Sequence, residues 1–463
     1  MPALAQALAA SGGDPCAQKA ALDAIGAVAT CSAAAFEPHY ATLMPLLAAA
    51  LAQTEGSKEQ EVVAQMRARA IECAALVGAA VGGERFRGDA PAILHAIVAD
   101  AAAPAVLSAA NPQGKPEDDG VDDLALSTLL PAAVRVVATC GARHLGNALE
   151  AVAAPLLAAA TAAPKVQHEA NAGDDELHRE AAGTYSIVIA GQRITVDLHA
   201  MWAKEKACDL LGELAEACGE DLPPAAAASF ASALAACQTA PGAENIRSTA
   251  SISLGQVVGA GVAGFRADAT RRSNASRLVD GALRSTFEAA TKETSDDARP
   301  LHIRGLADVL EHVAQSHAGG LEAGLASCLA APAPLAGAVD DAFLAGLVQG
   351  LIAAAKASDV RRSEVEKNLK EDDGYDDEDA DVLEEALAAE DELQSNVVNA
   401  IGWALKAKRE AFANGPFAAH ALPHYAPVLS RPDAREKDVH AALCALVDEP
   451  SGILGPGYVA TAT

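Results

Sequence analysis

The chain has 463 residues, of which 51% are hydrophobic and only 3% aromatic, and its 62 acidic against 34 basic residues give a net charge of −28. An excess of carboxylates this large repels nucleic-acid phosphates and anionic lipid head groups, so we exclude both as partners and expect basic polypeptides instead. The same carboxylates could also serve solubility alone. Much of the hydrophobic fraction is alanine, a strong helix former and a poor strand former, so we expect a mostly helical chain.

The nine cysteines are scattered without any CxxC pair, and most lie in apolar stretches of helical spacing. This pattern predicts buried free thiols in a reducing compartment rather than disulfides or a zinc site. The first fifteen residues lack the basic and apolar regions of a secretion signal, and no uninterrupted apolar run reaches the roughly 18 residues of a membrane span. We therefore expect a soluble protein inside the cell, without membrane insertion.

Helical segments alternate with short breaks rich in Gly, Pro or Asp along most of the chain. Start-to-start distances of about 44 residues, as from 14 to 58 and from 198 to 243, are typical of HEAT or armadillo helix pairs. We predict an all-α, right-handed superhelical solenoid of about eight HEAT-type pairs. The expected helices are 14–32, 37–53, 58–81, 88–100, 121–141, 145–162, 198–217, 223–237, 243–262, 267–292, 298–317, 338–370, 376–411, 415–429 and 433–446.

Two acidic segments interrupt this pattern, and they divide the chain into predicted regions. Residues 165–198 contain Asp174, Asp175 and Glu176, followed by two short apolar runs, Tyr185 to Ile189 and Ile194 to Leu198, that are compatible with a β-hairpin. Residues 371–392 hold 13 carboxylates in 22 positions, which predicts a mobile loop with a helix starting at Asp381. The expected regions are helical repeats 1–164, the insertion 165–198, repeats 199–370, the acidic loop 371–381 and truncated repeats 382–463.

No combination of residues predicts catalysis, a metal site or a cofactor. Gly259, Gly261 and Gly264 match GxGxxG, but a helix is expected before them instead of a strand, so a glycine-rich turn between helices is the favoured interpretation. The twelve histidines lack metal-ligand spacing, and we expect a protein that is not an enzyme. Trp202 and Trp403 are expected in the core. Asn399, one turn before Trp403, suggests as an alternative a surface that grips a peptide backbone.

Several segments resemble the importin-beta-like nuclear transport receptors, the karyopherin beta family, and in particular the middle part of the importin-five or karyopherin beta three type. The segment Met66 to Asp89 carries the most specific part of the resemblance, with an Ile-Glu-Cys run, an Ala-Val-Gly run and then a charged residue before Phe86. The other matching segments are Ala35 to Tyr40 with Leu43 to Pro45, Lys204 to Cys208, and the acidic, tyrosine-containing run Asp372 to Glu378.

The resemblance implies the central cargo-binding portion of a nuclear import receptor, carrying proteins with basic localisation signals, such as ribosomal proteins or histones, through nuclear pores. It also implies that Ran GTPase and FG nucleoporins are binding partners, that the protein is a monomer, and that it is located in the cytoplasm and the nucleus. Because the N-terminal and last repeats of such receptors have no counterpart here, we expect a partial receptor with weakened Ran binding. The expected cargo or Ran contacts are Asp174, Asp175, Glu176, Asp372, Asp373, Asp376, Asp377, Glu378, Asp379, Asp381, Asn399 and Trp403.

Three other interpretations are compatible with the sequence. The chain could be a HEAT-repeat interaction scaffold unrelated to transport, such as a phosphatase or microtubule-associated platform. The acidic runs could be solvated loops without a partner, which is a common fate of dense charge runs. A nucleotide-dependent oxidoreductase is the third class, and the GxGxxG match is its only support.

Overall fold

The computed structural model describes residues 2–11, 14–32, 36–53, 60–101, 124–163, 166–170, 184–189, 192–241, 243–317, 333–370, 377–408, 413–432 and 434–445. The chain divides into two compact units, unit 1 (Met1–Asp221) and unit 2 (Leu222–Thr463), and each is described by itself.

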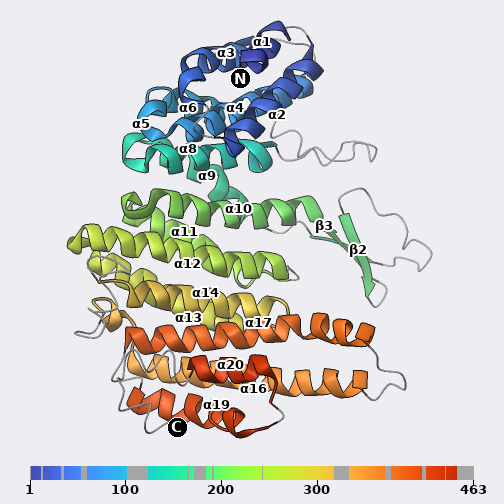
Figure 1. Cartoon of the computed structure of the whole chain (residues 1–463), viewed down its shortest axis with the longest axis vertical. Coiled ribbons are helices and arrows are strands. Elements are labelled where there is room, and N and C mark those ends of the chain that lie inside the picture. The colour runs from blue at the N-terminus through green and yellow to red at the C-terminus, as the bar shows by residue number, and fades with distance from the viewer. Residues whose placement is uncertain are drawn as a thin grey trace. The chain divides into compact units, whose positions relative to one another are not determined.

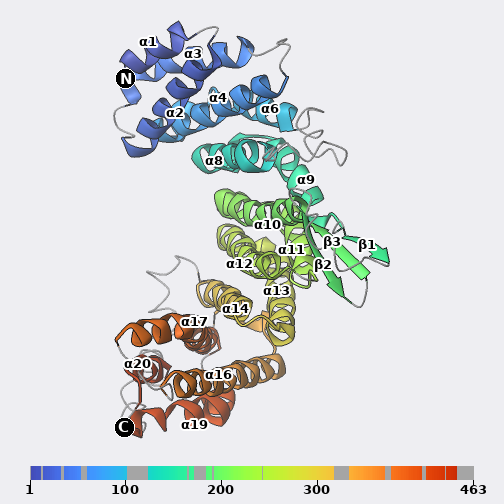
Figure 2. The same cartoon turned by 90° about the vertical axis from the view of Figure 1, so that its right-hand side faces the viewer.

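Unit 1 consists of paired helices, with a small sheet inserted before its last α-helix. The helices form two rows, α2, α4, α8 and α10 in one and α1, α3, α6 and α9 in the other, and each row packs on the other (Figure 2). The elements are α1 (Pro2–Ala10), α2 (Pro15–Cys31), η2 (Glu37–His39), α3 (Tyr40–Gln53), α4 (Gln60–Val81), α5 (Gly83–Phe86), α6 (Ala90–Ala101), η3 (Ala125–Leu129), α8 (Leu130–Cys140), η4 (Ala142–His144), α9 (Ala148–Thr161), β1 (Val166–Ala170), β2 (Thr184–Ile189), β3 (Gln192–Asp197), α10 (Leu198–Cys218) and η6 (Gly219–Asp221).

The helix pair around residues 66–89 shows how the sequence produces this packing. Ile71, Ala74 and Ala75 of α4 are fully buried, as their helical spacing predicts. The helix ends at Gly82, whose backbone φ of +85° is a conformation that residues other than glycine rarely adopt. Gly83 lies so close to α8 that a Cβ there would be 2.1 Å from the carbonyl oxygen of Thr139. The Gly-Gly break therefore both turns the chain and allows the next helix to approach.

The insertion forms a three-stranded antiparallel sheet in the order β1-β3-β2, beside the start of α10 (Figure 1). The expected hairpin is present as β2 and β3, with Thr184 opposite Asp197. The third strand, β1, was not predicted because its residues alternate too weakly in hydrophobicity to distinguish them from a polar loop. Asp197 ends β3 and caps α10, since its side chain accepts a hydrogen bond from the backbone N–H of Ala200 at 3.0 Å.

Unit 2 repeats the two-row arrangement. Helices α12, α14 and α17 pack side by side in one row, and α11, α13 and α16 lie in the other (Figures 1 and 2). The elements are α11 (Pro224–Cys237), α12 (Glu244–Ala267), η7 (Ala269–Arg271), α13 (Arg272–Lys292), α14 (Ala298–Ala314), η8 (Ala336–Ala338), α16 (Asp341–Lys370), α17 (Asp377–Ala407), η9 (Ala413–Ala421), α19 (Leu422–Tyr425), η10 (Val428–Ser430) and α20 (Glu436–Leu443).

Most predicted helices are present within a few residues of their expected ends, and three differences have physical causes. Helix α1 was not predicted, because nine residues are too few to show clear periodicity. Helix α17 begins at Asp377, in agreement with the expected range 376–411 and four residues before the alternative start at Asp381, since carboxylates are favourable at a helix N-terminus. The expected helix 415–429 is broken into η9, α19 and η10, in a segment with prolines at 416, 423 and 427.

The turn predicted at the GxGxxG match is wrong, because all three glycines lie inside α12. A Cβ at Gly259 would be 2.7 Å from Nε2 of His312 on α14, and one at Gly261 would be 2.5 Å from Cδ2 of Leu278 on α13. These glycines therefore give two neighbouring helices room to pack closely. A dinucleotide-binding site of this type requires a β-strand directly before the glycines, and in this chain that position is helical.

The cysteines only partly follow the expectation of burial. Five described cysteines are buried, whereas Cys16 and Cys31 are exposed and Cys444 is half-buried. Both exposed thiols lie at the ends of α2 (Pro15–Cys31). All the cysteines that the structure describes are free thiols. The buried ones are Cys73, Cys140, Cys208, Cys218 and Cys237.

Among the described helices, α16 alone has the length and apolar composition that a membrane span would need, over Asp341–Asn368. The core helix of a water-exposed fold meets the same criterion. Here α16 packs against α17 and η9, and its Arg361 and Arg362 form ion pairs with carboxylates of α17 and α20. Packing in unit 2 buries Leu344, Leu347, Val348, Leu351 and Ile352 of α16, whereas Val360 is exposed.

Candidate peptide-binding surface

Most of the predicted acidic contacts cannot be placed in a site. Asp174, Asp175 and Glu176 lie outside the described residues, as do Asp372, Asp373 and Asp376. The other four belong to the first turns of α17, where the structure describes the backbone only; they are Asp377, Glu378, Asp379 and Asp381. A role for either acidic segment in binding therefore stays a prediction.

Asn399 and Trp403 lie one turn apart on α17, as the sequence indicated. Asn399 is exposed and Trp403 is half-buried. The Nζ atom of Lys406 lies 4.1 Å from the centre of the Trp403 ring, which is the geometry of a cation–π contact. The indole of Trp403 thus already holds a cation from its own helix, which makes it a poorer platform for a basic ligand.

Trp202 lies on the surface, so its expected place in the core is wrong. Its exposed fraction is 40%. The buried side of α10 is formed by small and aliphatic residues such as Cys208, Leu211 and Ala215, and helical spacing puts Trp202 on the opposite side. No lysine or arginine that the structure describes stacks on this indole, in contrast to Trp403.

Carboxylates follow Trp202 along the same side of α10. The spacing of three, four, four and three residues from Trp202 puts Glu205, Asp209, Glu213 and Glu216 on one face of the helix. We call these five residues the acidic face of α10. One basic side chain lies within it, since Nζ of Lys206 contacts Oδ2 of Asp209 at 2.6 Å. The face therefore combines an exposed indole with more negative than positive charge.

Burial and mutual repulsion raise the pKa of two of these carboxyls. The pKa of Glu205 is raised first by burial and then by the charge of Asp209, against the opposing effect of Lys206. The pKa of Glu213 is raised by burial and by Asp209 and Glu216, while Lys206 and Arg135 of α8 act against the rise. A cation brought to this face would relieve the repulsion, so the face has an intrinsic preference for basic ligands.

The sequence contains a signal for this face, although the face was not among the predicted contacts. The stretch Trp202 to Glu216 carries its carboxylates at helical spacing opposite an apolar stripe. This stripe is diluted among alanines, so its charge density along the sequence is much lower than that of the acidic runs.

A second polar cluster lies in the interior of unit 2 and has the order of a catalytic triad. Oγ of Ser251 is 2.6 Å from Nδ1 of His302, whose Nε2 is 3.1 Å from Oε2 of Glu293. The side chains of His302 and Glu293 are 0% and 1% exposed, and Ser251 is also fully buried, so the cluster presents no nucleophile at the surface. The cluster is a buried network between helices. In the part of the chain that the structure describes, no group of three or more His, Cys, Asp or Glu residues could hold a metal ion.

Comparison with known proteins identifies the fold. No family model and no curated protein matches the chain. Solved structures do match, among them the karyopherin Kap121p bound to the SUMO protease Ulp1p, with a TM-score of 0.67 and 16% identity over 97% of this chain. Kap121p bound to Pho4p matches with a TM-score of 0.65 and 16% identity over 95% of this chain. Kap121p bound to the extreme C-terminus of the protein phosphatase Cdc14p matches with a TM-score of 0.65 and 17% identity over 99% of this chain.

The chain has an importin-beta-like karyopherin fold. It spans 36%, 35% and 38% of the length of these three Kap121p chains. The predicted all-α HEAT-repeat fold is confirmed. Within this karyopherin fold, the acidic face of α10 lies on the row formed by α2, α4, α8 and α10.

Proposed function

We propose that the chain is the central cargo-binding portion of a nuclear import receptor, and that the acidic face of α10 holds basic segments of its cargo. The observation that carries the proposal is the exposed Trp202 followed at helical spacing by Glu205, Asp209 and Glu213. The karyopherin fold and the protein-bound Kap121p structures support it, as does the net charge of −28.

The chemistry of this face suits lysine and arginine side chains. An indole attracts a cation over its ring, and carboxylates accept charge-assisted hydrogen bonds from ammonium and guanidinium groups. Each exposed contact of this kind contributes little, about 0–1 kcal/mol. A basic segment that makes several at once gains by multivalency and tolerates changes of sequence.

Other predicted residues contribute in the same proposal. The acidic runs at 174–176 and 372–381 attract the same basic cargo, such as ribosomal proteins or histones, over a longer range. Asn399 pairs with the backbone of an extended peptide, beside Trp403. Ran GTPase and FG nucleoporins complete the proposed cycle between cytoplasm and nucleus.

Titration with a fluorescent lysine-rich peptide at low salt tests the acidic face of α10. We expect Trp202→Ala to weaken binding by about fivefold, which corresponds to about 1 kcal/mol, and the double variant E205Q/E213Q to weaken it by about tenfold, about 1.4 kcal/mol. The matched control E150Q/E288Q removes two exposed carboxylates elsewhere and should change affinity much less. Trp403→Ala is the matched control for the indole, and we expect a smaller loss because Lys406 covers that ring.

Equal affinity of E205Q/E213Q and E150Q/E288Q would show that binding responds only to total charge, and the proposed role of α10 would then be wrong. Replacing Asp372, Asp373, Asp376 and Asp377 by Asn measures, in the same assay, how much the acidic run contributes to the affinity for the lysine-rich peptide.

A separate experiment distinguishes a transport receptor from an unrelated scaffold. We expect the chain to bind immobilised phenylalanine-glycine repeat peptides, and GTP-loaded Ran to compete with the lysine-rich peptide. If the basic peptide binds while both Ran and the repeat peptides fail to bind, the scaffold alternative is favoured.

A further inference from the structure

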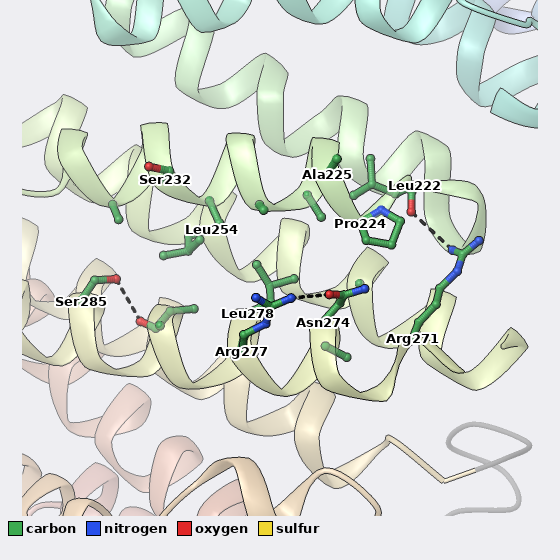
Figure 3. A pocket seen from close by; sticks show the side chains of 18 residues that line it. Leu222, Pro224, Ala225, Ser232, Leu254, Arg271, Asn274, Arg277, Leu278 and Ser285 are labelled. Atoms are coloured by element: carbon green, nitrogen blue, oxygen red, sulfur yellow. Dashed lines mark hydrogen bonds between the residues drawn. The ribbon is translucent and has the colours of Figure 1, made fainter. Parts of the chain in front are cut away.

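Helices α11 and α13 of unit 2 leave an apolar groove of about 540 Å³ between them (Figure 3). In the figure, Ser232 and Ser285 lie toward one end, and Leu222, Pro224 and Arg271 toward the other. Leu254 and Gly261 of α12 also line the groove. Its volume lies in the range of natural ligand pockets, about 300–1,000 Å³.

The groove exists because the facing side chains are too small to fill the space. On α11 they are Ala225, Ala228, Ala231 and Ala235, which recur every three or four residues and are exposed or half-buried. On α13, Gly281 is exposed, and a Cβ placed on it would meet no atom within 4 Å. Larger side chains at these positions would close the groove, so its apolar walls are open to an incoming side chain.

The charged side chains that line the groove are basic, in contrast to the acidic chain, although one of them, Arg271, is paired with Asp268 (Nε to Oδ2, 3.8 Å). The lining of the groove contains Arg271 and Arg277 and no carboxylate, although acidic residues outnumber basic ones by 62 to 34 in the whole sequence. The guanidinium of Arg277 donates a hydrogen bond to Oδ1 of Asn274 at 2.6 Å and forms no ion pair with any carboxylate that the structure describes. Asp280, the nearby carboxylate on α13, pairs instead with Arg284 at 2.7 Å.

We propose that this groove docks a short segment of a partner protein that carries bulky apolar side chains next to a carboxylate. The apolar side chains lie between α11 and α13, and the carboxylate pairs with Arg277. The wall from Ala225 to Ala235 is about 15 Å long at 1.5 Å per residue, which matches about five residues of extended peptide. This ligand is the opposite in charge to the one proposed for the acidic face of α10, so the inference goes beyond the proposed function.

Fluorescence anisotropy with four labelled peptides tests the chemistry of the ligand on the full chain. The probe alternates Leu and Phe with Glu; in two others Gln or Lys replaces Glu, and in the last Ala replaces Leu and Phe. We expect the Gln peptide to bind about tenfold more weakly than the Glu peptide, a loss of about 1.4 kcal/mol. We expect no measurable binding of the Lys and Ala peptides.

Two surface substitutions test the location. Gly281→Leu fills the groove, and because glycine is unfavourable inside a helix it should leave the fold intact. Its matched control is Gly346→Leu on α16, where a Cβ also meets nothing within 4 Å. We expect Gly281→Leu to weaken binding of the Glu peptide at least about tenfold, and Gly346→Leu to leave it unchanged.

Charge reversal provides the second test of location. We expect Arg277→Glu to lower the affinity for the Glu peptide about tenfold and to make binding of the Lys peptide measurable. Arg304→Glu on α14 makes the same change of charge outside the groove and should do neither.

The proposal is overturned if the Glu peptide fails to bind, if it binds equally well to the Gly281→Leu variant, or if the Gln and Lys peptides bind as tightly. A neutral phenylalanine-glycine peptide that binds the groove more tightly than the Glu peptide would also overturn it. Binding of the lysine-rich peptide at α10 should be unaffected by Gly281→Leu, so the two proposals can fail separately.

Discussion

Glu293 is a buried carboxylate whose hydrogen-bond partners compensate for its loss of solvent. Arg247 donates two hydrogen bonds to it, both of 2.7 Å, and the backbone N–H groups of Thr294 and Ser295 donate at 2.8 and 2.9 Å. Burial acts to raise the pKa of Glu293, but the hydrogen bonds from Arg247, Ser295 and His302 outweigh it and lower the pKa to about 2. The charged form is thus built into the junction of α12, α13 and α14.

Histidines on α14 make the stability of unit 2 sensitive to pH. Burial lowers the pKa of His302, and it lowers the pKa of His312 to about 4. Below their ordinary pKa of 6.5 the unfolded chain binds protons that the folded chain does not, so stability is lost as the pH falls from 6.5 toward 4. Burial raises the pKa of Asp308 to about 6, and this carboxyl therefore acts in the opposite direction between pH 6 and its ordinary value of 3.8.

We expect the free energy of unfolding to fall between pH 7 and pH 5 for the unmodified chain, measured by urea denaturation. His312→Gln should make the fall shallower, because it removes a group that binds protons only when unfolded. Asp308→Asn should make it steeper, because it removes the group of opposite sign. Identical slopes for both variants would contradict this assignment.

At the scale of helices, close approach is controlled by a few glycines in contact with a neighbouring backbone. A Cβ at Gly305 of α14 would be 2.6 Å from the carbonyl oxygen of Ser251 on α12. Because that neighbour is backbone, it cannot rotate away as a side chain could. The two helices form one of the most extensive packing contacts of unit 2, so this spacing matters for the whole row.

Gly305→Ala is expected to destabilise unit 2 by about 1–3 kcal/mol, the usual cost of overpacking a core. Gly281→Ala is the matched control on α13, where there is room for the methyl group, and alanine should stabilise the helix by up to about 1 kcal/mol. Urea denaturation of both variants measures the difference. A Gly305→Ala variant as stable as the original would show that α12 and α14 can separate without cost.

At the scale of the whole molecule, the net charge of −28 acts on stability and on binding in opposite directions. Like charges destabilise a compact fold, and salt screens them over about 8–10 Å at physiological ionic strength. The same screening weakens attraction to a basic ligand.

We therefore expect added NaCl to raise the thermal unfolding midpoint of the chain. Over the same range of concentration, it should lower the affinity for the lysine-rich peptide. Binding of the Glu peptide to the groove should weaken less, since its apolar contacts are not screened. Calorimetry and anisotropy at about 20, 150 and 500 mM salt test this, with Debye lengths of about 20, 8 and 4 Å. A basic peptide that binds equally at all three would show that charge does not drive its recognition.

The amino-acid sequence by itself determined the helical class, the HEAT-type pairing, most helix ends and the excess of acid, because these depend on local propensity and spacing along one chain. It also contained the side of α10 on which Trp202 lies, but not whether another helix covers that side. Only the tertiary structure decided that Trp202 is exposed and that Gly259 and Gly261 serve packing, whereas the contact of Lys406 with Trp403 lies within one turn of α17. The groove between α11 and α13 also required the structure, because an empty space depends on which small side chains face each other. Periodicity fixes the faces of a helix, whereas the neighbours of each face are set by segments distant in sequence.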